Sequence, residues 1–68
     1  MSRESRIFAK KMSKLRKAGG MTQLELALKT GLDLTTINEL ENGHREPLLA
    51  TLRKVARAMR VSIDTLTS

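Results

Sequence analysis

The chain has 68 residues, a net charge of +6 and no cysteine, so we expect one small domain that buries about 60% of its unfolded surface. Without cysteine it has neither disulfides nor thiolate metal sites, and apolar packing, with or without a second copy of the chain, must supply its stability. No apolar run approaches the roughly 18 residues of a membrane span, and residues 1–20 lack the apolar core of a signal peptide. We therefore expect a soluble, cytoplasmic protein without a membrane partner.

The positive charge is concentrated at the two ends of the chain. Residues 1–20 carry seven Lys and Arg against Glu4, a net +6, whereas residues 21–52 have a net charge of −3. Residues 53–68 restore +3. Solvation of a helix face is a sufficient explanation for any single Lys or Arg, but the summed charge favours a polyanion as partner.

The first predicted helix covers about residues 5–18. Phe8, Met12 and Leu15 recur at i, i+4 and i+7 and form one apolar stripe, with basic residues around the rest of the helix. Gly19 then ends the helix.

A second, shorter helix is predicted to start at Gln23. Thr22 and Glu25 form a capping-box pattern in front of it, and Gly31 can adopt the left-handed turn that closes it. Helical spacing places three of its residues on the inward side, namely Leu26, Ala27 and Thr30.

The rest of the chain is predicted to form three further helical segments. Asp33 is a good N-cap for a third helix that Gly43 closes, with Ile37 and Leu40 on its core side. After Pro47 a long apolar stripe predicts a fourth helix, and its members are Leu49, Leu52, Val55, Ala56 and Met59. Ser62 can cap a last turn that holds Ile63 and Leu66. Because no segment alternates like a strand, we expect an all-α fold, a compact five-helix bundle.

The residues from Gln23 onward, in their order and spacing, resemble the helix-turn-helix of the phage repressor and Cro family of bacterial regulators, often called the XRE family. The family has inward-facing apolar residues, a small residue and a turn glycine at fixed positions. The residues at these positions here are Leu26, Ala27, Gly31, Leu32, Ile37 and Leu40. The flanking segments KLRKAGGMTQLELA, ELENGHREP and TLRKVARAMRVSIDTL match as well, so the resemblance covers residues 12–66. It implies a single helix-turn-helix DNA-binding domain over residues 1–68, with the motif at about residues 23–42.

The resemblance implies that the third helix enters the major groove and that its outward residues meet the bases. Thr35 can bond a base or touch a thymine methyl, Asn38 can pair with adenine, and Glu39 can accept from cytosine N4. Leu34 can only pack on a methyl group. For each of the four side chains, a solvated helix face is the alternative explanation.

A second set of residues is expected to contact phosphates, which position the duplex without reading it. Gln23 opens the second helix, where its amide and the free N–H groups of the helix end can meet a phosphate together. Arg45 matches a basic loop position of the family and is the expected cationic contact, with Asn42 and His44 close by in sequence. An exposed loop imidazole is the alternative for His44.

Arg16 and Glu41 occupy positions where the family commonly places a paired arginine and glutamate that join the first helix to the third. We expect the same ion pair here, which would neutralise Glu41 locally. The resemblance also implies that Arg60, where the family often has glycine, adopts a left-handed conformation at a cost of roughly 1 kcal/mol.

A homodimer is expected from the resemblance, because such proteins read two half-sites about one helical turn, roughly 34 Å, apart. The candidate surface is Leu48, Leu49, Val61, Ile63 and Leu66. The alternative is that these five residues complete the core of the monomer.

Apolar residues also stand where the family is usually polar. Leu24 and Leu28 lie four residues apart on the second helix, and with Leu34 they would leave apolar surface exposed. Either they contact a protein partner, or they pack on the first or third helix. The first possibility supports an alternative function, a protein-interaction module such as an antitoxin-like partner with DNA binding secondary.

The sequence offers no group of residues suited to catalysis. One His, no Cys, no Tyr, no phosphate loop and no carboxylate pair argue against an enzyme, a cofactor or a metal site. The sequence therefore predicts a sequence-specific double-stranded DNA-binding transcriptional regulator associated with the nucleoid. We expect it to act as a dimeric repressor on an inverted repeat.

Overall fold

The computed structural model describes residues 2–68, and all regular structure in this part of the chain is α-helical. Met1, the first residue of the predicted domain, lies outside the described residues. The helices are, in chain order, α1 (Arg3–Ala18), α2 (Gln23–Thr30), α3 (Leu34–Glu41), α4 (Leu49–Met59) and α5 (Ile63–Thr67). The predicted all-α, five-helix fold is confirmed.

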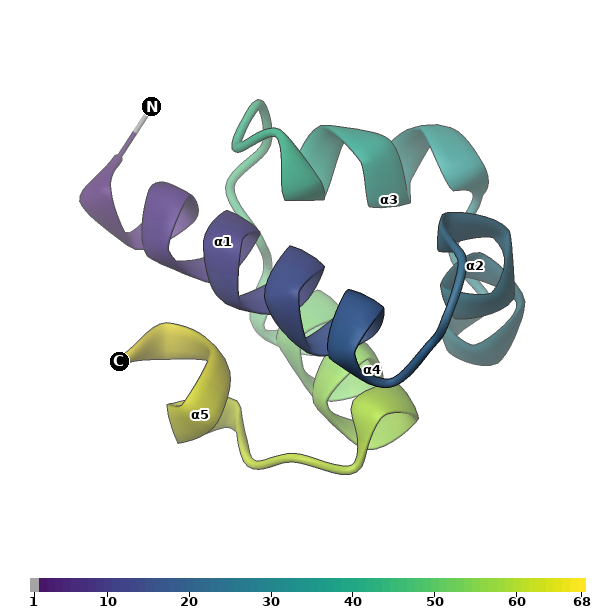
Figure 1. Ribbon diagram of the computed structural model, residues 1–68. Coiled ribbons are helices and arrows are strands. Elements are labelled where there is room, and N and C mark those ends of the chain that lie inside the picture. The colour runs from purple at the N-terminus through teal and green to yellow at the C-terminus, as the bar shows by residue number, and fades with distance from the viewer. Residues whose placement is uncertain (1) are drawn as a thin grey trace.

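The helices surround one core, with α1 crossing the middle of the molecule (Figure 1). α3 packs on α1 and α2, α4 packs on α1 and α2, and α5 packs on α1 and α4. In Figure 1, α3 lies along one side of the molecule, and no other helix of the described chain covers its outer side. The fold therefore leaves α3 supported from within and open outward.

Side-chain caps set the starts of α1, α2, α3 and α5, whereas α4 starts without one. The Thr22 hydroxyl accepts from the Glu25 N–H at 3.0 Å, and the Glu25 carboxylate accepts from the Thr22 N–H at 2.9 Å. Asp33 accepts from the Thr36 N–H at 2.7 Å at the start of α3. These hydrogen bonds confirm the predicted capping box and N-cap, and each satisfies N–H groups that a helix start leaves without a partner.

α1 begins earlier than the apolar stripe predicted. The Ser2 hydroxyl accepts a hydrogen bond from the Ser5 N–H at 3.0 Å, so the helix starts at Arg3 and not near Ser5. A cap acts on the backbone two or three residues ahead, and therefore it extends a helix beyond its first core-facing side chain.

The turn between α2 and α3 depends on Gly31. Its φ is +76°, a conformation that costs glycine little and other residues more, and its N–H donates to the Ala27 carbonyl at 2.9 Å. The Thr30 hydroxyl is buried beside it, donates to the Leu26 carbonyl at 2.8 Å and accepts from the Leu32 N–H at 3.2 Å. The turn is thus closed with its buried polar groups satisfied.

Arg60 ends α4 with a φ of +57°, the only positive φ of a residue other than glycine in residues 2–68. Its N–H lies 3.2 Å from the Arg57 carbonyl, and the Val61 N–H donates to the Ala56 carbonyl at 3.0 Å. The left-handed conformation predicted for Arg60 is confirmed, and these bonds offset its cost.

All five helices contribute buried side chains to the core. Its fully buried side chains are Phe8, Met12, Leu26, Ile37, Leu40, Val55 and Leu66. Because Leu66 is 0% exposed within the monomer, its side chain cannot reach a second copy, and its assignment to the dimer surface is wrong. Val61 and Ile63 pack partly against the same core.

The start of α4 departs from the predicted apolar stripe. Leu49 belongs to the predicted stripe and also to the predicted dimer surface, and it is 56% exposed; the preceding Leu48 is 73% exposed. Leu49 is the first residue of α4, and its exposure shows that the neighbouring helices leave its side chain largely uncovered.

Candidate nucleic-acid interface

The outer face of α3 is free and its inner face is anchored. Ile37 and Leu40 are 0% exposed and fix the helix to the core. On the other side, Leu34, Thr35 and Asn38 are exposed. A helix with one apolar face buried and one polar face open has a defined rotation about its axis, so these three side chains keep a fixed outward direction.

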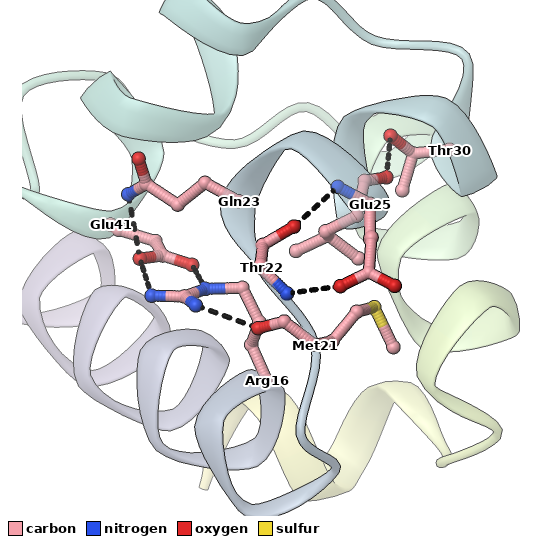
Figure 2. A network of polar contacts seen from close by, with 8 residues as sticks. Arg16, Met21, Thr22, Gln23, Glu25, Thr30 and Glu41 are labelled. Carbon is pink, nitrogen blue, oxygen red and sulfur yellow. Dashed lines mark hydrogen bonds and ion pairs between the residues drawn. The ribbon is translucent and has the colours of Figure 1, made fainter.

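A buried ion pair holds the end of α3 to α1 (Figure 2). Arg16 Nε donates to Glu41 Oε2 at 2.6 Å, and Arg16 Nη2 donates to Glu41 Oε1 at 3.0 Å. The side chains are only 10% and 5% exposed. The predicted pair is therefore present in the bidentate geometry that gives arginine and carboxylate both strength and direction.

The same ion pair reaches the start of α2. Arg16 Nη1 donates to the Met21 carbonyl at 2.8 Å, and Gln23 Nε2 donates to Glu41 Oε1 at 3.0 Å. Hydrogen bonding to Glu41 raises the pKa of Arg16 above its ordinary value. Four contacts thus join α1, the loop after it, α2 and α3 into one unit, which we call the Arg16 network (Arg16, Met21, Gln23 and Glu41; Figure 2).

Gln23 was assigned to a phosphate from the sequence, and the structure gives its amide nitrogen another partner. It donates to Glu41, and the side chain is partly buried at the first position of α2. The amide therefore helps to orient α2 against α3. Contact of this residue with a phosphate remains a prediction.

Two residues assigned to DNA bind each other across the end of α3. Arg45 Nη2 lies 2.6 Å from Glu39 Oε1, with the side chains 51% and 37% exposed. In addition, the His44 N–H donates to the Glu39 carbonyl at 2.9 Å, which holds the loop after α3 against the helix end. Arg45 and Glu39 are therefore both at the surface and close together.

Asn38 and Asn42 form a second surface pair. Asn42 Nδ2 donates to Asn38 Oδ1 at 3.0 Å. The two side chains are exposed. The spacing of four residues on one helix face could have predicted this contact, which the sequence reasoning missed, whereas no sequence signal links Gln23 with Glu41.

The residues expected to contact DNA lie on α3 or on the loop after it, except Gln23, which comes from α2. In residues 2–68 no three His, Asp or Glu side chains gather closely enough to hold a metal ion. No helix in this range has the length and apolarity needed to cross a membrane.

This fold and this open helix define the class of helix-turn-helix proteins. The helix-turn-helix family HTH_3 matches residues 12–66, and the chain belongs to this family. The family is one of DNA-binding transcription regulators and not of enzymes. The predicted membership of the XRE-type regulators is confirmed.

Individual relatives support the assignment. The chain is 36% identical over 56 residues to the cryptic phage CTXphi transcriptional repressor RstR of Vibrio cholerae, covering 82% of this chain and 50% of that protein. It is 30% identical over 63 residues to the uncharacterized HTH-type transcriptional regulator YazB of Bacillus subtilis, covering 93% and 91%. The restriction-modification controller protein C.AhdI from Aeromonas hydrophila superposes with a TM-score of 0.90 at 29% identity, covering 96% and 98%. The chain spans only 43%, 50% and 65% of the length of three curated relatives.

Proposed function

We propose that the chain binds double-stranded DNA in a sequence-specific manner and represses transcription as a dimer on an inverted repeat. The observation that carries the proposal is the anchored but uncovered α3, with the Arg16 network behind it. A relative is named as a transcriptional repressor of a phage, which supports repression over activation.

α3 suits the major groove in size and chemistry. The groove is about 12 Å wide and accepts one helix, and the outward side chains Thr35, Asn38 and Glu39 offer a hydroxyl, an amide and a carboxylate. Thr35 would bond a base or touch a thymine methyl, Asn38 would pair with adenine, and Glu39 would accept from cytosine N4. Leu34, 45% exposed at the first position of α3, would pack on a methyl group.

Contacts with phosphates would hold α3 in register. Arg45 is the main cation of the loop after α3, and it would exchange Glu39 for a phosphate oxygen on binding. Asn42 and His44 lie exposed on the same loop and would assist. The free N–H groups at the start of α2, next to Gln23, would meet the backbone on the other side of the groove.

Dimerisation would use the apolar surface that the monomer leaves open. Leu48 and Leu49 are 73% and 56% exposed, and Val61 and Ile63 are partly exposed. Association through these four residues would place two copies of α3 on half-sites about 34 Å apart. Sedimentation at micromolar concentration, alone and with DNA, tests it, and a strictly monomeric result in both states would refute the dimer.

The experiment for DNA binding is selection of duplexes from a random pool on the full chain, followed by sequencing. An inverted repeat is expected. On the recovered site, Asn38→Ala should relax the preference at one position of each half-site at a cost of about 1–3 kcal/mol, whereas Arg45→Ala should weaken all sequences alike. No enrichment of any duplex would refute the proposed function.

One observation favours a second candidate function. Leu24, Leu28 and Leu34 are 57%, 75% and 45% exposed, so they do not pack away on the neighbouring helices. They could bind a protein partner, as an antitoxin-like module would. Binding to such a partner should change little with salt, because apolar contact releases no counterions, whereas DNA binding should weaken steeply.

A further inference from the structure

A hollow of about 300 Å³ lies where α1 meets the end of α3. Its lining residues are Arg6, Ala9, Lys10, Glu41, Asn42 and Gly43. Asn42 is one of the residues assigned to phosphate contact, so the hollow borders the proposed interface. Figure 1 shows the connection after α3 next to the N-terminal half of α1.

The positive charge around this hollow is not neutralised. Glu41 is its acidic lining residue, but both Glu41 oxygens already accept hydrogen bonds from Arg16 or Gln23. Arg6 and Lys10 are exposed, and neither forms an ion pair within residues 2–68. The hollow therefore presents two cations one helical turn apart on α1.

Part of the positive charge around a larger hollow elsewhere has a structural explanation. This hollow measures about 520 Å³, lies between the ends of α2 and α4, and is lined by the cations Lys29, Lys54, Arg57 and Arg60. Lys29 and Arg57 lie in the last turns of their helices, where the helix dipole stabilises a cation.

Arg6 has no such explanation. It lies at the N-terminal end of α1, where the helix dipole disfavours a positive charge. A cation that opposes the dipole, forms no ion pair within residues 2–68 and borders the proposed DNA interface is better accounted for by an external anion.

We propose that Arg6 and Lys10 bind a phosphate of the duplex backbone beside the end of α3, and so extend the DNA-contacting surface onto α1. The contact would position the duplex without reading its sequence. The inference rests on the proposed function, since the phosphate it requires belongs to the duplex that α3 reads.

The test is the salt dependence of the dissociation constant of the full chain between about 50 and 200 mM KCl, a range in which lost phosphate contacts are resolved. Two duplexes are used, one with the selected site and one scrambled to the same composition. Arg6→Ala with Lys10→Ala is compared with Lys54→Ala with Arg57→Ala. The second pair removes the same charge from the larger hollow.

Removal of two phosphate contacts should lower the magnitude of the salt slope by roughly 1.8. We expect this loss for the Arg6 and Lys10 pair on both duplexes, and an unchanged slope for the Lys54 and Arg57 pair. Thermal melting confirms folding of both variants. If the alanine pair melts early, Arg6→Gln with Lys10→Gln removes the charges and keeps polar side chains of similar reach.

Two results would overturn the inference. An unchanged slope for the Arg6 and Lys10 pair would show that neither residue contacts a phosphate. An equal loss in both pairs would assign the effect to overall charge. A wild-type chain that binds neither duplex is a separate outcome, because it refutes the proposed function itself together with this extension of it.

Discussion

The two ion pairs within residues 2–68 have the same N···O distance, 2.6 Å, but lie in opposite surroundings. Arg16 and Glu41 are 10% and 5% exposed, whereas Arg45 and Glu39 are 51% and 37% exposed. Water screens the second pair and not the first. Distance alone therefore says little about energy, and burial decides what each pair does.

The difference fits two tasks. The buried pair cannot exchange partners without leaving a charge unpaired, so it maintains the angle between α1, α2 and α3. The exposed pair can open at little cost in free energy. Its two side chains can replace their mutual contact with water, and Arg45 can replace it with a phosphate. Rigid support inside and exchangeable charge outside are what a helix that docks into a groove requires.

The largest expected effect comes from breaking the buried pair on one side only. Arg16→Ala leaves the Glu41 carboxylate without its charged partner and should lower the free energy of unfolding by roughly 3–5 kcal/mol. Urea unfolding followed by circular dichroism measures it. Arg45→Ala, the matched change in the exposed pair, should cost less than about 1 kcal/mol.

Replacing both members of the buried pair provides the control. Arg16→Met with Glu41→Leu removes two charges together, and such replacements are often neutral or stabilising by about 1–4 kcal/mol. An unchanged urea midpoint for Arg16→Ala alone would contradict the importance that the geometry gives to this pair.

The exposed pair leads to a smaller, functional prediction. Glu39→Gln frees Arg45 and removes a negative charge from α3, the helix proposed to face DNA, so affinity for a scrambled duplex should rise about fivefold, corresponding to roughly 1 kcal/mol. Affinity for the selected site should rise less, because the substitution weakens the acceptor proposed for cytosine N4. Fluorescence anisotropy on both duplexes measures the ratio.

Asp64→Asn provides the control for charge in this experiment. It removes one negative charge from α5, away from α3 and the loop that follows it, and should leave the ratio of the two affinities unchanged. If Glu39→Gln instead lowered the affinity for both duplexes equally, Glu39 would be shown to support the structure and not to discriminate between sequences.

Local chemistry explains what the sequence could predict. The capping box of Thr22 and Glu25, the N-cap Asp33 and the turn at Gly31 all act within a few residues of the chain. Helical spacing likewise placed Ile37 and similar side chains in the core. Such features need no knowledge of the tertiary arrangement, and the five helices follow from them.

Features that depend on packing could not be predicted in the same way. Gln23 and Glu41 are 18 residues apart in the chain, and only the fold brings them together. The apolar character of Leu66 and Leu48 gave no sign that one is buried and the other exposed, because an apolar stripe does not show which helix covers it. The Arg16 pair was predicted only through resemblance to a family.

The smallest expected effect concerns the exposed caps, which support α2 and α3 locally while the buried pair joins them. Hydrogen bonds from the backbone N–H groups of Thr22 and Thr36 lower the pKa values of Glu25 and Asp33 below their ordinary 4.5 and 3.8. A carboxylate with a lowered pKa in the folded state stabilises the fold above its ordinary pKa. This contribution is lost as the pH falls from about 4.5 through the lowered values.

Asp33→Asn isolates this effect. Asparagine caps a helix about as well as aspartate but does not titrate, so the variant should match the wild type at neutral pH and lose less stability between pH 5 and about 2. Thermal melting across this range measures it, with Asp64→Asn as the control for charge, since Ser62 and not Asp64 caps α5. If Asp33→Asn loses as much stability at acid pH as the wild type does, the charge of the α3 cap contributes nothing to stability. The orientation of α3 would then depend on the buried Arg16 network and the apolar core alone.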